Sequence, residues 1–244
     1  MSRKSYWDTD RHYSQPSTEQ IKRNAAQTAK KAVDKGKTLC PVMLSGRTIA
    51  KSWWGKAWCE NLERYADYES RLSRGQRYVR SGAVVDLQIE KGKILARVQG
   101  SRKTPYKVEI RISPLSEERC NEIMNRCSCR VDTMEHLIGG SFPVEMKDIF
   151  LSKDGLFPNP KEISFRCSCP DWALMCKHVA AALYGVGARL DEDPTMFFTL
   201  RGIDTTRFVD VVIANRIEAM LSNAGNPSDR IMDGADLTSL FGVV

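Results

Sequence analysis

Apolar and polar residues alternate in three consecutive stretches near the middle of the chain. The apolar positions are Val85, Leu87 and Ile89, then Ile94, Ala96 and Val98, and finally Tyr106, Val108, Ile110 and Ile112. A period of two is typical of strands that bury one face. Lys91 and Gly92 supply a turn after the first stretch, and Gly100 to Pro105 separates the second from the third. The sequence therefore predicts a small antiparallel β-meander.

Helical periodicity flanks the meander on both sides. Trp54, Trp58 and Leu62 recur every four residues, which predicts a helix from Ser52 to about Leu72 whose aromatic stripe belongs to the core. Further helices are expected at residues 18–35 behind a Ser17 cap, after Ser113 and Pro114, from about Cys176, at 195–200, and through the apolar positions between Val209 and Leu221.

Four potential metal ligands lie within twelve residues: Cys167, Cys169, Cys176 and His178. If residues 162–169 are extended, the first two side chains point to one face. The last two must lie at a helix entrance, since two helical steps rotate a side chain by about 200°. Three thiolates and one imidazole fill a tetrahedral shell, so the sequence predicts one structural zinc ion. The alternative is two elements with buried cysteines and His178 on the surface.

A second Cys-x-Cys pair, Cys127 and Cys129, lies near Cys120 and His136. These four residues could in principle hold another zinc ion. However, Cys120, Cys127 and the apolar residues between them fall on one helical stripe, which favours small core side chains. We therefore expect no second metal site.

The segment "CSCPDWALMCKHVAAALY" resembles a SWIM zinc finger. Together with "WWGKAWCENLE" and "RYVRSGAVVDLQIEKGKILARVQGSRKTPYKVEIRISPLS", it resembles bacterial SWIM zinc finger proteins over roughly residues 45 to 240. The genes of such proteins often lie beside a Swi/Snf-type helicase. The resemblance implies a nucleic-acid or protein-interaction module, a helicase as partner, and no catalytic residue.

The expected fold is α+β: the meander packed with helices, then a zinc-stapled β-hairpin/helix module and C-terminal helices. With 244 residues, 42% of them hydrophobic, the chain can form one large domain or two small ones. Three regions are predicted: a basic N-terminal arm at 1–49, partly disordered or loosely helical; an α+β domain at 50–140; and the zinc module with an acidic helical end at 141–244.

The net charge of +7 conceals a strong asymmetry along the chain. Residues 71–112 hold eleven Lys or Arg against three acids, whereas residues 191–244 hold four Arg against nine acids. The polar face of the meander is expected to carry Gln88, Arg97, Gln99, Lys107 and Arg111. We call the candidate nucleic-acid contacts the basic strip; they are Arg74, Arg77, Arg80, Arg97, Arg102, Lys103, Lys107 and Arg111. The alternative is an ordinary solvated face.

Trp172, between the ligand pairs, is expected to cover the metal or to pack on the following helix; stacking on a nucleobase is the alternative. A closed zinc shell, and a sequence without a glycine-rich phosphate loop, argue against an enzyme. No membrane segment or signal peptide is recognised, so a cytoplasmic location is expected.

The predicted function is a non-enzymatic zinc protein that binds nucleic acid, DNA in the first place and RNA as an alternative, and that assists a Swi/Snf-type helicase in DNA transactions. A pure protein adaptor is the alternative function. A nuclease or transferase that acts on nucleic acid is the least favoured of the three functions.

Overall fold

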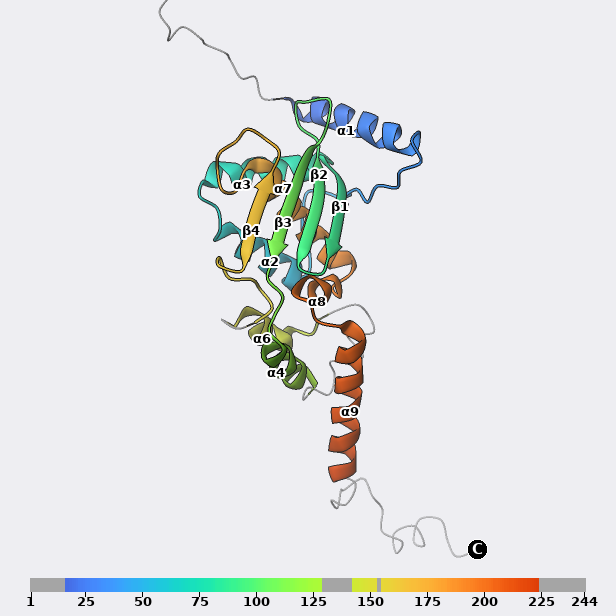
Figure 1. The fold of residues 1–244 in the computed structure, drawn as a ribbon, viewed down its shortest axis with the longest axis vertical. Helices are drawn as coiled ribbons and strands as arrows, with labels where there is room; N and C mark the ends of the chain where they lie inside the picture. Colours follow the sequence, from blue (N-terminus) through green and yellow to red (C-terminus); the bar gives the residue numbers. More distant parts are fainter. Residues whose placement is uncertain (1–15, 129–141, 153–154, 224–244) are drawn as a thin grey trace, which may run out of the picture.

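A four-stranded antiparallel sheet organises the protein, in the spatial order β1-β2-β3-β4 (Figure 1). The computed structural model describes residues 16–128, 142–152 and 155–223. The strands are β1 (Val84–Glu90), β2 (Lys93–Val98), β3 (Tyr106–Ile112) and β4 (Ile163–Cys167). The three predicted strands are confirmed, as is the turn at Gly92, whose positive φ of 67° suits glycine. The fourth strand comes from the segment that precedes the first zinc ligand.

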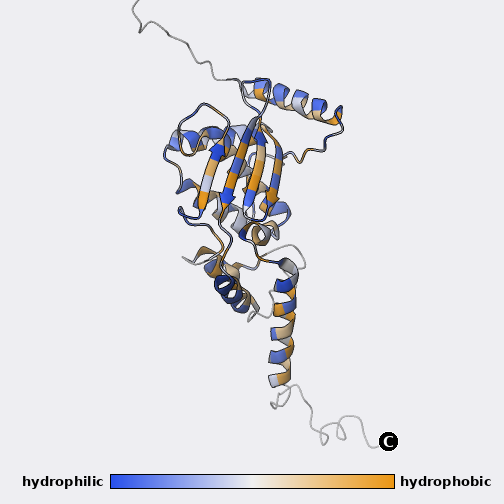
Figure 2. Ribbon diagram, viewed as in Figure 1, coloured by the Kyte–Doolittle hydropathy of each residue, from blue (hydrophilic) through white to orange (hydrophobic). Residues whose placement is uncertain are grey.

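Apolar and polar residues alternate along the strands (Figure 2), so most apolar side chains share one face of the sheet and most polar ones share the other. Ile94, Val98, Val108 and Ile110 are buried on the face that the helices cover. The opposite face, which we call the open face, has Arg97 beside Lys107 and Glu109 beside Arg166. Gln99 was predicted on this polar side, but it is fully buried: its side chain accepts a hydrogen bond from Thr28 at 2.8 Å, because an N-terminal helix covers the end of β2.

The covered face packs on α7 (Lys177–Glu192), with α3 (Glu69–Arg80) and α2 (Trp53–Glu63) beside it (Figure 1). Residues 178–188 of α7 are all buried. A Cβ added at Gly75 of α3 would lie 2.6 Å from the Cβ of Ala180, so only glycine permits this close approach of the two helices. The central helix is therefore enclosed on all sides by the sheet and two helices.

The single helix predicted from residue 52 to about residue 72 is two helices, α2 and α3. The segment between these helices is not helical. Within it, Asp67 accepts hydrogen bonds from two backbone N–H groups of the loop at 170–175. The aromatic stripe does belong to the core, as predicted. Its indole N–H groups donate to backbone carbonyl oxygens, at 2.8 Å each: Trp53 to Phe142, Trp54 to Leu190 and Trp58 to Leu183.

The other helices frame this unit. They are α1 (Thr18–Val33), α4 (Glu117–Ser128), the 3₁₀ turn η1 (Val144–Met146), α6 (Lys147–Leu151), α8 (Met196–Arg201) and α9 (Thr205–Asn223). The Ser17 side chain caps α1 by accepting from the Gln20 N–H at 3.1 Å, as predicted. Helix α9 contacts α4 and extends away from the sheet (Figure 1). No described helix is long and apolar enough to cross a membrane.

The mixed α and β fold predicted from the sequence is confirmed. The pairing of β3 with β4 joins the meander and the zinc-bearing segment in one sheet. The division near residue 140 lies outside the described residues and stays a prediction. Cys129 and His136 lie outside them too, so the expectation of no second metal site also stays a prediction.

A buried ion pair fastens α8 to the segment that enters β4. Arg201 is 1% exposed, and its guanidinium donates to Glu162 at 3.2 Å and to the Ser113 carbonyl at 2.7 Å. Arg119 donates to the same carboxylate at 3.0 Å. Burial by itself would raise the pKa of Glu162, but the Asn159 backbone N–H and the two guanidinium groups outweigh it, so the pKa lies below its ordinary value.

We predict that Glu162→Gln lowers the unfolding free energy by about 3 kcal/mol at pH 7, because it leaves the buried Arg201 charge without its counterion. The folded-state pKa of Glu162 is depressed, so the carboxylate stabilises the protein above the ordinary pKa of 4.5 and loses this effect as the pH falls through the depressed value. Urea unfolding at pH 7 and below pH 4.5 should therefore show a difference between wild type and variant that shrinks in acid. The exposed Glu118→Gln is the matched control, and an equal loss in both variants would contradict the prediction.

Candidate metal centre

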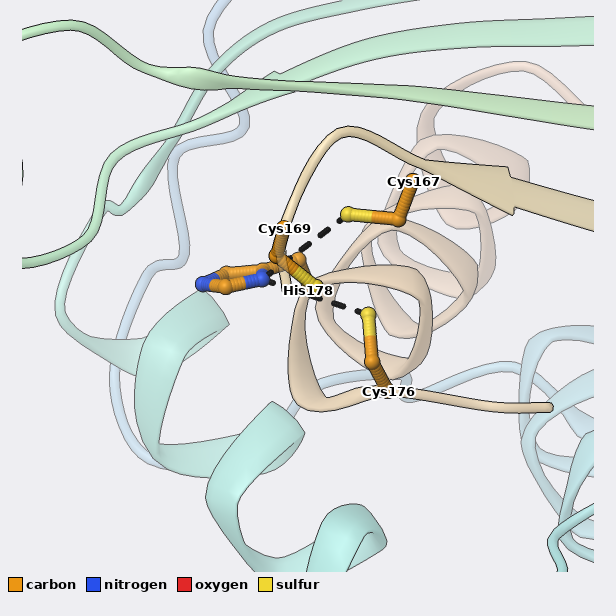
Figure 3. Close-up of side chains that lie close together, drawn as sticks. All are labelled: Cys167, Cys169, Cys176 and His178. Atoms are coloured by element: carbon orange, nitrogen blue, oxygen red, sulfur yellow. Dashed lines mark hydrogen bonds between the residues drawn. The ribbon is translucent and has the colours of Figure 1, made fainter. Parts of the chain in front are cut away.

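The predicted ligands converge where the last strand ends and the central helix begins. Cys167 is the final residue of β4, Cys169 follows it, and Cys176 is the N-cap residue of α7. His178 lies in the first turn of α7 and is 1% exposed. Figure 3 shows the three sulfur atoms and Nδ1 of the imidazole pointing toward one another. The strand and the helix entrance thus position the ligands as the sequence predicts.

The spacing of the ligand atoms fits a tetrahedral zinc ion. All four lie within 4.8 Å of one another, and Nδ1 of His178 is 3.9 Å from the sulfur atoms of both Cys167 and Cys176. Zinc bonds of about 2.3 Å to sulfur and 2.0 Å to nitrogen require ligand separations of about 3.5 to 3.8 Å. A small contraction around the ion satisfies this geometry. The donor set closes the shell with protein atoms, and the cluster therefore holds one structural zinc ion.

The three neighbouring thiol groups shift one another's pKa values in opposite directions. The neighbouring thiols of Cys167 and Cys176 hydrogen-bond to Cys169 and hold its pKa well below the ordinary thiol value. The same interaction with Cys169, followed by that with Cys176 and by burial, raises the pKa of Cys167. Burial lowers the pKa of His178, which favours the neutral imidazole that binds metals. A divalent cation stabilises all three thiolates together, so the cysteines no longer compete for one negative charge.

Two carboxylates hold the loop between the ligand pairs. Asp67 accepts from the backbone N–H of Leu174 at 2.9 Å and of Met175 at 3.4 Å. Asp171 accepts from Arg71 at 3.1 Å and from the Ala173 backbone N–H at 3.3 Å. Helix α3 and the segment before it therefore fix the loop from one side, while the metal fixes both of its ends.

The imidazole of His178 is fixed by aromatic contacts. The Tyr106 ring, at the start of β3, stacks on it with a centroid distance of 4.2 Å, and the Tyr78 ring meets it edge to face at 5.5 Å. The Arg102 guanidinium lies 5.4 Å from the centroid of the same Tyr106 ring. A Cβ on Gly100 would lie 2.6 Å from the Tyr106 ring and 3.3 Å from Nε2 of His178. Glycine at position 100 therefore leaves the room that this stack requires.

A pocket of about 440 Å³ opens beside the zinc ligands. We call it the basic pocket; among its lining residues are Arg71, Arg74, Arg77, Tyr106, Lys177 and His178. Its four cations outnumber the one carboxylate, Asp171, and the single negative charge that three thiolates leave around a divalent ion. The pocket can therefore attract an anion.

Buried side-chain donors lie among the residues that line the basic pocket. Nε of Arg71 and Nε2 of His178 have no hydrogen-bond partner among the residues that the structure describes. With Nδ1 assigned to zinc, Nε2 carries the ring proton. Buried donors without an acceptor are rare in folded proteins, and an unseen water or polar ligand is a common explanation. This environment suits a polar occupant.

The basic strip does not form one surface. Arg74 and Arg77 line the basic pocket, and Arg102 and Lys103 are exposed on the adjacent β2–β3 turn. Arg80 lies at the far end of α3 and donates to the Arg47 carbonyl at 3.0 Å. The remaining members are on the open face of the sheet; they are Arg97, Lys107 and Arg111.

Charge pairing separates these two groups of cations. On the open face, Arg97 lies 3.7 Å from Asp86 and Arg111 lies 2.6 Å from Glu109. Glu109 has a lowered pKa, first because of its hydrogen bond with Arg111. The acids on neighbouring strand positions therefore reduce the positive potential of the open face. The basic pocket is the stronger candidate for an anion because its lining also holds buried donors without an acceptor in the described part of the chain, Nε of Arg71 and Nε2 of His178.

Trp172 does not cover the metal, contrary to the sequence prediction. Its side chain is 79% exposed, and its ring contact is with Tyr68, edge to face at a centroid distance of 5.7 Å. Leu174 on the same loop is 66% exposed. Ala173 and Met175 of this loop are buried, and the alternate residues Trp172 and Leu174 therefore face solvent.

The other described cysteines behave as small core or surface residues. Cys127 is fully buried on α4, as the stripe predicted, and burial raises the pKa of Cys120 on the same helix. Burial, followed by the charges of Glu63 and Asp191, raises the pKa of Cys59 to about 12, so this thiol stays protonated. Cys40 is exposed.

Several residues of the site were not among the predicted contacts. Arg71 completes a row with Arg74 and Arg77, and the three-residue spacing on one helix face could have indicated it. Lys177 lies between two zinc ligands, where a cation also stabilises the thiolates. Asp67 and Tyr106 had no recognisable signal, because their roles depend on contacts between segments far apart in the sequence.

We predict that Cys169→Ala abolishes stoichiometric zinc binding and increases protease cleavage between about residues 165 and 190. Structural zinc contributes on the order of 10 to 16 kcal/mol in finger peptides, so the local unit should not survive its loss. Metal analysis and limited proteolysis measure both effects. Cys40→Ala, at an exposed position, is the matched control and should retain one zinc ion per chain. A Cys169→Ala protein with full zinc content and an unchanged digestion pattern would disprove the assignment.

Comparison with known proteins agrees with this geometry. Over 183 residues the chain is 33% identical to the uncharacterized protein Rv2102 of Mycobacterium tuberculosis; the alignment covers 74% of this chain and 64% of that protein, less than two thirds of its length. No solved structure gives a significant match. Residues 165–186 match the family model of the SWIM zinc finger, and this segment contains all four ligands. A SWIM zinc finger with one structural zinc ion therefore occupies residues 165–186 of the chain.

Proposed function

We propose that this protein is a non-enzymatic zinc protein that binds nucleic acid through the surface around its SWIM zinc finger. The observation that carries the proposal is the basic pocket, in which Arg71, Arg74, Arg77 and Lys177 gather beside the metal centre. A phosphodiester carries one negative charge and oxygen acceptors, which match guanidinium and ammonium donors. Arg102 and Lys103 on the adjacent turn extend the same cationic surface.

The zinc ion has a scaffolding role in this proposal. Four protein ligands fill its shell, so no position is left for a water nucleophile or for a substrate. By joining β4 to α7, the ion fixes the floor of the basic pocket and the loop that borders it. We therefore propose that zinc removal abolishes nucleic-acid binding through loss of shape, and that the protein has no catalytic activity of its own.

An accessory role beside a Swi/Snf-type helicase is the finer form of this proposal. It is supported by the resemblance to bacterial SWIM proteins and by α9, which extends from the body and exposes apolar side chains. These are Val209, Ile213, Ile217, Met220 and Leu221. Affinity isolation from the native host, with and without nuclease, tests this role. A helicase that is retained after nuclease treatment supports direct contact, and its absence from both samples contradicts the role.

The alternative function is a protein adaptor without nucleic-acid contact, and the exposed apolar row of α9 is the observation that favours it. Binding of the purified zinc-loaded protein to labelled DNA and RNA distinguishes the two. Affinity for nucleic acid should fall steeply as salt rises. Absent or salt-insensitive binding favours the adaptor.

We predict that Arg74→Ala weakens nucleic-acid binding and makes the slope of log affinity against log salt less steep by about 0.7 on single strands or 0.9 on duplex, as expected for one lost phosphate contact. The measurement is fluorescence anisotropy over a salt series. Arg111→Ala is the matched control, because Arg111 already pairs with Glu109 on the open face. If Arg111→Ala has the larger effect, the open face rather than the basic pocket binds the phosphates.

A further inference from the structure

The loop between the two pairs of zinc ligands, residues 170–175, exposes the indole of Trp172 to solvent. Packing within the protein does not explain why a tryptophan stands at this position. Trp172 is 79% exposed, although Trp53, Trp54 and Trp58 of the same chain contribute to the core or pack against it. A single exposed apolar side chain is ordinary on a protein surface. The unusual feature of Trp172 is its position, between the two ligand pairs and directly after Asp171, which lines the basic pocket.

The loop that carries Trp172 is tied to the rest of the protein on both sides of the indole. The residues on either side of it are fixed by hydrogen bonds: Asp171 pairs with Arg71 at 3.1 Å and accepts from the Ala173 N–H, and Leu174 donates its N–H to Asp67 at 2.9 Å. Zinc ligands close both ends of the loop, and Tyr68 supports one edge of the indole. The ring is therefore held in place before any ligand arrives, which lowers the entropy cost of stacking on it.

The first residues of the loop that carries Trp172 line the basic pocket. Pro170 and Asp171, the two residues before Trp172, line the pocket together with Arg74 and Lys177. A cationic pocket for phosphate next to an exposed aromatic ring is the combination by which proteins hold single-stranded nucleic acid. A base that is paired within a duplex keeps its faces against its neighbours, so an indole can stack only on an unpaired or terminal base.

We propose that the zinc finger binds single-stranded nucleic acid in preference to duplex, with a phosphate in the basic pocket and an adjacent unpaired base stacked on Trp172. This inference rests on the proposed nucleic-acid-binding function and specifies the form of its ligand. Every base has an aromatic face, so the contact is expected to tolerate different sequences. The 2′-hydroxyl takes no part in it, so DNA and RNA strands both qualify.

The test uses the full-length, zinc-loaded protein and three labelled probes: an oligothymidylate of about 16 nucleotides, an abasic strand of equal length, and a duplex of equal length. We expect wild type to bind the oligothymidylate most tightly and Trp172→Ala to weaken this binding by roughly 5- to 100-fold, the range for one lost base stack. The same variant should leave binding to the abasic strand and the salt slope unchanged. Trp172→Phe, which keeps an aromatic face, should retain most of the affinity.

Leu174→Ala is the matched control on the same loop, and it should bind the oligothymidylate as wild type does. Because both side chains are largely exposed, these variants should keep the zinc content and the thermal unfolding midpoint of wild type. Stacking also quenches tryptophan fluorescence, and the part of the quenching due to Trp172 should disappear in Trp172→Ala.

The outcomes separate the inference from the function on which it rests. If wild type binds none of the probes, the proposed function is wrong. If wild type binds the probes but Trp172→Ala matches it on the oligothymidylate, or the abasic strand binds equally well, only the stacking inference is wrong. An equal loss on oligothymidylate and duplex, or an equal loss in Leu174→Ala, also overturns the inference, because the loop would then be a general apolar contact.

Discussion

Zinc coordination fixes where the last strand of the sheet ends and where its central helix begins. Cys167 closes β4, Cys176 precedes α7, and His178 lies within the first turn of that helix. Because α7 is buried against the sheet, α2 and α3, any displacement of its first turn would be transmitted through the core. The free energy of metal binding is thus folding free energy for the whole arrangement as well as for the finger.

The same coordination builds a surface from segments that are distant in sequence. Helix α3 contributes the arginines, the start of β3 contributes Tyr106, and the finger contributes Lys177 and His178. Gly75 permits α3 to approach α7, and Gly100 permits Tyr106 to stack on the imidazole. The metal therefore holds in place both the pocket and the loop that carries Trp172, and its removal should disturb the two together.

Charge pairing decides which cations remain available to a ligand. On the open face, acids at neighbouring strand positions pair with Arg97 and Arg111. In the basic pocket four cations face Asp171, which also anchors the loop through Arg71, and the single negative charge of the zinc centre. A count of charge along the sequence cannot distinguish these two environments, because it does not show which residues face one another.

Local patterns in the sequence determined the three meander strands, the start of α7 and the identity of the zinc ligands. Strand alternation and metal-ligand spacing each involve only a few neighbouring residues, so they can be recognised in the sequence alone. Only the tertiary structure decided that the predicted helix breaks at Asp67, that Gln99 is buried, that Trp172 is exposed, and that the basic strip divides into two surfaces. Each of these depends on a contact between distant segments, and such contacts override local propensity when they satisfy buried polar groups or fill the core.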